Sequence, residues 1–186
     1  PAPCRNCHDN PQPIRPECAQ QLARSRCALT YSGLYSNLVS DGNFWQQGGG
    51  IELSAEAYHG LGVAMSISGV RVSNIQGSGV NLTTITDVFG PRYTWTTRSR
   101  KIAFFGQGLI GEAHGSDSVF PTSQGAVTSF NSFALQVGGG VDLRLSKHFA
   151  IRPFQADWLR TQFSNASTNV QKNFRLGAGV IFRLEK

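Results

Sequence analysis

The segment Asn173–Leu184 reads NFRLGAGVIFRL, and an apolar residue occupies every second position from Phe174 to Leu184. Most positions between them hold charged or small residues, such as Arg175. Alternation with a period of two is typical of a β-strand that has two different faces. A strand that crosses hydrocarbon at a tilt needs about 9–11 residues, whereas globular strands have about 5–6. The length and the pattern of this segment therefore predict a membrane-spanning β-strand.

Seven more segments repeat this design along the chain. They are expected at residues 29–38, 46–57, 62–72, 82–94, 102–113, 132–144 and 149–161. The connections between them alternate long and short, and the longest loop is expected at Gly115–Phe130. Long outer loops and short periplasmic turns are typical of outer-membrane barrels. The pattern predicts an all-β fold, an eight-stranded antiparallel transmembrane β-barrel over residues 29–186, with both termini on the periplasmic side.

The composition limits the class of protein. Charged residues make up only 15% of the chain, against about 25% in a typical soluble domain. The mean hydropathy is −0.20, and no run approaches the roughly 18 apolar residues that a transmembrane helix needs. The net charge of +6 comes from scattered lysines and arginines, so we expect no nucleic-acid partner. The chain starts at Pro1 and reads as a mature form whose export signal has been removed or omitted.

Four stretches carry a resemblance to a known family. They are FGPRYTW (Phe89–Trp95), FFGQGLIGEAHG (Phe104–Gly115), the segment Asn131–Phe163 and the closing strand Asn173–Leu184. In these stretches the chain resembles the bacterial outer-membrane β-barrel family that includes the OmpA-type and OmpX-type small barrels. The resemblance implies an outer-membrane location with lipid as a partner, and it implies a fold rather than a reaction. The alternative is a soluble, lipocalin-like barrel with a ligand in its interior.

Polar residues assigned to the inward positions of the strands are the candidates for the barrel interior. An eight-stranded barrel has room only for side chains, and unpaired charges there are costly. We therefore expect a paired polar network, with a conducting or proton-passing path as the alternative. The predicted members are Glu52, Glu56, Arg92, Glu112, Asp142, Arg144, Gln155, Asp157 and Arg175.

His114 is the candidate for catalysis, because Ser116 and Asp117 lie close to it in the sequence. A catalytic triad needs a geometry that spacing does not show, and no hydrolase motif accompanies these residues. We therefore expect a protein that is not an enzyme.

The first 28 residues are expected to form a periplasmic extension rich in proline and cysteine. Its cysteines are Cys4, Cys7, Cys18 and Cys27. An even number of cysteines in an exported segment is typical of disulfides, here two with three possible pairings. The alternative is a c-type haem, because Cys4, Cys7 and His8 form the C-x-x-C-H attachment motif. The sixth iron ligand would then be His59 or His148, which both lie in predicted periplasmic turns.

Two functions fit these observations. The first is a non-enzymatic structural or interaction protein of the outer membrane, whose disulfide-stapled N-terminal segment contacts a periplasmic or neighbouring-subunit partner. The second is an electron-transfer component that carries one covalent haem at Cys4, Cys7 and His8. In that case Cys18 and Cys27 would be left to pair with each other.

Overall fold

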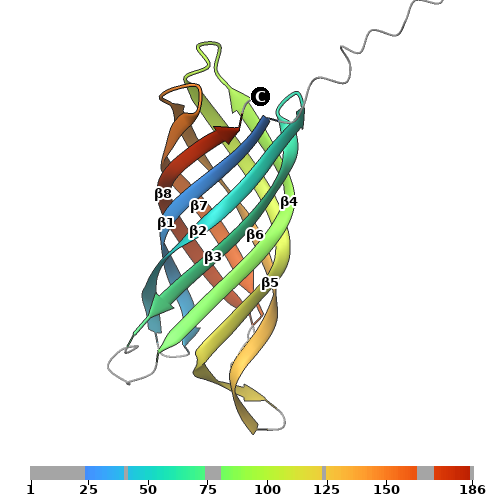
Figure 1. The fold of residues 1–186 in the computed structure, drawn as a ribbon. Coiled ribbons are helices and arrows are strands. Elements are labelled where there is room, and N and C mark those ends of the chain that lie inside the picture. The colour runs from blue at the N-terminus through green and yellow to red at the C-terminus, as the bar shows by residue number, and fades with distance from the viewer. Residues whose placement is uncertain (1–23, 40–41, 74–80, 123–124, 163–169, 185–186) are drawn as a thin grey trace, which may run out of the picture.

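The computed structural model is a closed barrel of antiparallel strands, in which each strand pairs with the next and β8 pairs with β1 (Figure 1). It describes residues 24–39, 42–73, 81–122, 125–162 and 170–184. Among these residues, no helix is long and apolar enough to cross a membrane. The predicted all-β, eight-stranded antiparallel barrel is confirmed. The strands are β1 (Arg24–Val39), β2 (Gly42–Tyr58), β3 (Leu61–Val72), β4 (Leu82–Thr96), β5 (Ile102–Thr122), β6 (Gly125–Arg144), β7 (Phe149–Thr161) and β8 (Gln171–Leu184).

The two ends of the barrel differ in their connections. At the end where β1 begins and β8 ends, short turns join β2 to β3, β4 to β5 and β6 to β7; this short-turn end is at the top of Figure 1. The tightest turn contains His59 and Gly60, whose φ angles are 46° and 89°. Two-residue hairpin turns that match the strand twist need positive φ angles, which glycine adopts at little cost. The other connections lie at the opposite end, which we call the long-loop end because it holds the two longest connections, from β3 to β4 and from β7 to β8. The connections from β1 to β2 and from β5 to β6 span only two residues each, so the predicted alternation of long and short connections does not hold there.

The hairpin of β5 and β6 is longer than the sequence predicts. Residues 115–130, expected as the longest loop, instead continue both strands, with Phe120 paired to Val127 and Thr122 to Gly125. β5 has 21 residues and β6 has 20, and their hairpin extends past the neighbouring strands at the long-loop end (Figure 1). Its Gly, Ser, Asp and Pro residues favour loops when taken singly, but strand formation depends on cross-strand pairing more than on intrinsic propensity.

β1 begins earlier than expected, at Arg24 rather than at Leu29. Cys27 therefore lies in the barrel wall, paired with Leu53 of β2 and Phe182 of β8, and not in the extension. Ala28 is buried inside the barrel. Because the first residues of β1 have pairing partners on both sides, the sheet starts before the apolar alternation becomes clear in the sequence.

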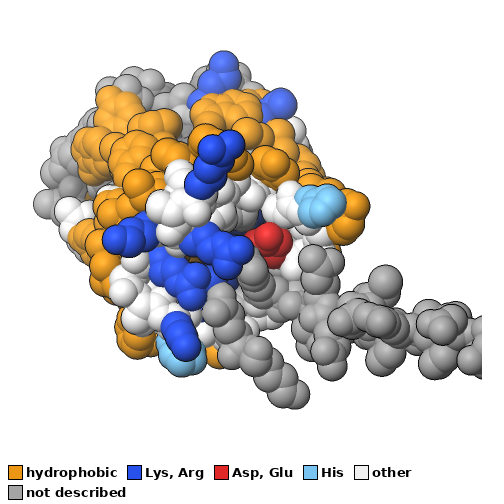
Figure 2. All heavy atoms as spheres, turned by 90° about the horizontal axis from the view of Figure 1, so that it is seen from above, with side chains coloured by type: hydrophobic (Ala, Val, Ile, Leu, Met, Phe, Trp, Pro, Cys, Tyr) orange, Lys and Arg blue, Asp and Glu red, His pale blue; other side chains and the backbone are white. Residues whose placement is uncertain are grey.

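The outer wall of the barrel is apolar. Phe89 and Trp95 are 64% and 60% exposed, and apolar side chains line much of the visible rim when the barrel is viewed along its length (Figure 2). Aromatic pairs lie near both ends, Tyr35–Trp45 toward the long loops and Trp95–Phe104 toward the short turns, as interfacial girdles do. Soluble proteins rarely expose contiguous apolar patches larger than a few hundred Å². This exterior argues against the soluble, lipocalin-like alternative.

The inward-facing side chains form two zones. Near the short-turn end and in the middle of the barrel they are polar and charged, and they form the site described below. Nearer the long-loop end the inward side chains are mixed: buried polar residues such as Gln46 and Gln136 lie beside an apolar cluster that was not predicted from the sequence. The members of this cluster are Leu34, Phe44, Ala64, Val70, Leu82, Val88, Leu109, Ala113, Ala134 and Leu159.

Candidate functional site

Two buried arginines form the centre of the polar zone. Arg92 of β4 contacts the carboxylates of Glu52 and Asp142, the latter at 3.5 Å. Arg152 of β7 contacts the same two groups, with 2.8 Å from Nη1 to Oε1 of Glu52 and 2.8 Å from Nε to Oδ1 of Asp142. None of the four residues is more than 5% exposed. Two cations and two anions thus form a neutral group, which we call the charged quartet.

Phe105 of β5 packs against both arginines of the quartet. The centre of its ring lies 3.7 Å from the guanidinium carbon of Arg92 and 4.2 Å from that of Arg152. Such cation–π contacts favour a guanidinium that has been removed from water. Gly140 of β6 leaves space for the ring, because a Cβ at this position would lie 2.9 Å from it. The glycines of β6 therefore provide room for large side chains in the lumen.

A second ion pair extends the network across β7 and β8. Arg175 donates to Oδ2 of Asp157 from Nε at 3.1 Å and from Nη2 at 3.0 Å, and to Oγ of Ser68 from Nη1 at 2.7 Å. Gln155 links this pair to the quartet. Its amide oxygen accepts from Nη1 of Arg152 at 2.9 Å, and its amide nitrogen donates to Oδ2 of Asp157 at 2.8 Å.

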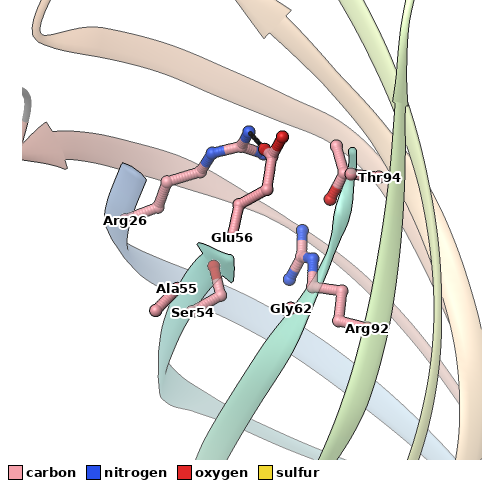
Figure 3. A pocket seen from close by; sticks show the side chains of 8 residues that line it. Arg26, Ser54, Ala55, Glu56, Gly62, Arg92 and Thr94 are labelled. Atoms are coloured by element: carbon pink, nitrogen blue, oxygen red, sulfur yellow. Dashed lines mark hydrogen bonds and ion pairs between the residues drawn. The ribbon is translucent and has the colours of Figure 1, made fainter. Parts of the chain in front are cut away.

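The network reaches the short-turn end at the ion pair of Arg26 and Glu56, where Nη2 and Oε2 are 2.9 Å apart. Figure 3 shows this pair beside Arg92 around a cavity of ≈ 10 Å³, which is room for about one water molecule. Lysine and arginine side chains gather around this mouth of the barrel (Figure 2). The mouth is therefore basic at its rim and nearly closed inside.

The charges of the network cancel. Its arginines are Arg26, Arg92, Arg152 and Arg175, and its carboxylates are Glu52, Glu56, Asp142 and Asp157. Burying a charge without a partner costs roughly several kcal/mol. Because each buried charge here has a partner of opposite sign, these residues can remain inside the barrel. Described side chains occupy the interior in both zones, as expected for a barrel of this size. The arrangement is suited to sealing the barrel and holding its strands together.

Seven of the nine predicted interior residues take part in this network. They are Glu52, Glu56, Arg92, Asp142, Gln155, Asp157 and Arg175. Arg144 is half-buried at the end of β6, where its Nε donates to the carbonyl of Ser146 at 3.2 Å.

The prediction for Glu112 is wrong. This residue is exposed on the outer wall, where it pairs with Asp87 of β4 and Phe133 of β6. Apolar residues such as Phe105 and Leu109 face inward on β5, so this strand has apolar residues on both faces. Its alternation therefore does not reveal which face is the inner one.

Arg152 is the central interior residue that was not predicted from the sequence. Arg26 and Gln107, which contact Glu56 and Glu52, were not predicted either. Arg152 is 1% exposed and lies three positions before Gln155, a spacing that would place the two on opposite faces of a regular strand. The register of β7 with β8 shifts between Arg152 and Gln155, and Pro153 and Phe154 both face outward. Both polar residues therefore point inward. Pro153 was the available signal, because proline within a sheet is found at edges and bulges.

His114 is exposed on the outer wall of β5, where its Nδ1 contacts Oδ1 of Asn131 on β6. This is a cross-strand contact on one face of the sheet. The contact joins an imidazole to an amide, and the side chain of Asp117 lies outside the described ones.

The remaining predicted site residues concern the cysteines and the haem. Cys4, Cys7, His8 and Cys18 lie outside the described residues. Cys27 forms no disulfide with a described residue, and the other three cysteines of the chain lie outside the described part. His59 and His148 are exposed at the short-turn end, in the turn between β2 and β3 and the turn between β6 and β7. In the described part of the chain, no group of three or more His, Cys, Asp or Glu residues could hold a metal ion.

Comparisons with known proteins bear on the fold. No protein-family model matches the chain, and no curated protein matches its sequence. Its structure is similar to neisserial surface protein A, with a TM-score of 0.66 and 13% identity over 86% of this chain and 97% of that one. It is also similar to Ail, the attachment invasion locus protein of Yersinia pestis, with a TM-score of 0.59 and 16% identity over 87% of this chain and 99% of that one. The chain therefore has the fold of the small outer-membrane barrels that its sequence resembles.

Proposed function

We propose that this chain is a non-enzymatic protein of a bacterial outer membrane, and that its barrel crosses the bilayer as a plug closed to ions. The similarity to neisserial surface protein A and Ail supports the fold on which this proposal rests. The apolar exterior suits a lipid environment. In the proposed orientation both termini and the short turns face the periplasm, and the long-loop end faces outward.

The two faces of the barrel wall differ in chemistry, and the proposal rests on this difference. The outer face exposes apolar side chains such as Phe89 and Trp95. The inner face holds the neutral quartet and the apolar cluster, with buried uncharged polar side chains beside the cluster. A lumen that side chains fill and that carries no excess charge offers an ion little attraction and little room. We infer that the protein acts through what it presents at its two ends, as a structural or interaction protein.

Two measurements test this proposal. The full chain, expressed with an export signal, should fractionate with outer membranes, and external protease should cut at the long-loop end and not at the short turns. Purified barrel in a planar bilayer should show no steady conductance above the lipid background. A general porin run in the same bilayer is the positive control. A stable open level in the wild type would contradict the closed-plug function.

The role of the N-terminal segment is a separate part of the proposal. We propose that it is stapled by disulfides and contacts a periplasmic or neighbouring-subunit protein, and the C-x-x-C-H motif keeps electron transfer through one covalent haem as the second candidate. Intact mass of the mature chain, with and without reductant, decides between them. A mass increase of one haem that survives denaturation favours electron transfer, and a loss of four hydrogens favours two disulfides. A fully reduced chain without an addition would contradict both.

A further inference from the structure

The outer wall has an open hollow on β2 and β3. Gly49 and Gly69 are cross-strand partners on the outward face, so two neighbouring positions of the wall carry no side chain. The hollow has a volume of ≈ 420 Å³ and is bounded by Ile51, Leu53, Met65 and Ile67. Ligand pockets usually have volumes of about 300–1,000 Å³. Its size and apolar lining suit a hydrocarbon chain.

A cation lies next to the hollow on its long-loop side. Arg71 occupies the outward position that follows Gly69 on β3, is exposed, and forms no ion pair with a described residue. Its cross-strand partner Gln47 accepts a hydrogen bond from the Tyr31 hydroxyl at 2.8 Å. Toward the short turns, the outward residues of β3 are apolar. From the long-loop end toward the short turns, this wall therefore presents a charged and polar region, then the hollow, then apolar side chains. An anionic lipid has the same order, with a charged headgroup followed by apolar acyl chains.

Two outward carboxylates of the described strands lie to one side of this site. Asp87 of β4 pairs with Ile67 of β3 and with Glu112 of β5. Arg71 is four residues along β3 from Ile67, a distance of about 13 Å in a strand. The two carboxylates would repel a phosphate on the β4 side, whereas Arg71 would attract one at the end of the hollow.

We infer that this surface binds one lipid A molecule of the outer leaflet, with an acyl chain in the hollow and a phosphate at Arg71. The inference rests on the proposed function, because it requires the long-loop end to face outward. A guanidinium recognises phosphate through short, charge-assisted hydrogen bonds. Filling the hollow and removing the cation should therefore each weaken binding on their own.

The chain offers matched variants for the test. A Cβ at Gly69 would meet nothing within 4 Å, and the same holds at Gly108 of β5, so leucine fits at both positions while only Gly69→Leu fills the hollow. Arg71→Gln removes the cation, and Arg160→Gln on β7 is its control. Native mass spectrometry of the full chain counts bound lipid after incubation with lipid A or phosphatidylglycerol in mild detergent. A difference in gel migration between unboiled and boiled samples verifies that each variant is folded.

We expect one lipid A per wild-type barrel, and about tenfold weaker retention in Gly69→Leu and Arg71→Gln. Gly108→Leu and Arg160→Gln should retain lipid A as the wild type does. Equal retention by folded Gly69→Leu would overturn the inference and leave the proposed function intact. Equal retention of phosphatidylglycerol, or a mass of two chains without lipid, would also overturn it by identifying another occupant. Failure of the wild type to reach the outer membrane would instead contradict the proposed function.

Discussion

Replacing Arg152 by methionine tests the argument that charge balance holds the interior together. The substitution keeps a long side chain but removes the contacts to Glu52, Asp142 and Gln155. The quartet then keeps two carboxylates and a single guanidinium, that of Arg92. Removing one partner of a buried ion pair costs roughly 3–5 kcal/mol, because the remaining charge is left uncompensated. We expect a loss of stability in this range, a large part of the roughly 5–15 kcal/mol that stabilises a typical domain.

The second variant in this test restores the balance. Adding Asp142→Asn to Arg152→Met leaves Glu52 and Arg92 as a neutral pair. The double variant should therefore be less destabilised than the sum of the two single variants, with a coupling of about 0.5–3 kcal/mol. Arg160→Met on the same strand is the matched control, and it should change stability by no more than about 0.5 kcal/mol because Arg160 lies outside the network.

The assay is guanidinium unfolding of the detergent-folded barrel, followed by tryptophan fluorescence. The midpoint should fall strongly for Arg152→Met with little change in slope, since the surface exposed on unfolding stays similar. The reasoning is refuted if Arg152→Met and Arg160→Met have the same midpoint. It is also refuted if the effects of Arg152→Met and Asp142→Asn simply add, because the two residues would then not share a charge balance.

Two further predictions concern the two faces of the wall. Gly138→Ala should lower the unfolding midpoint, because its Cβ would lie 2.1 Å from Oδ1 of Asp157; Gly108→Ala, in open space, should not, and equal midpoints would contradict the steric argument. Met65→Arg on the outer wall should reduce stability in lipid vesicles by about 2–4 kcal/mol, against about 0–1 kcal/mol for Tyr58→Arg near the rim. Equal losses at the two depths would contradict the membrane-spanning assignment.

Most of the fold could be predicted from the sequence, because a period of two is a local property. The closing strand shows it clearly: Phe174, Val180 and Phe182 are exposed, whereas Arg175 and Ile181 are buried. The number of strands and their antiparallel order follow from repeating that pattern with short connections. The hairpin of β5 and β6 could not be predicted in the same way, because its residues beyond 115 gain strand structure from each other and not from their own propensities.

The interior was only partly predictable from the alternation of inward and outward positions. This alternation is interrupted where a strand bulges, and it does not reveal the inner face where a strand has apolar residues on both faces. Arg152 was left out of the predicted interior for the first reason, and Glu112 was wrongly included for the second. Which carboxylate meets which arginine depends on strands far apart in the sequence, as Arg152 and Glu52 show. Local alternation thus determined that this chain forms a barrel with an apolar exterior. Only the closure of the sheet decided how its charges pair, because eight strands have to meet around one axis before their inward side chains can compensate one another.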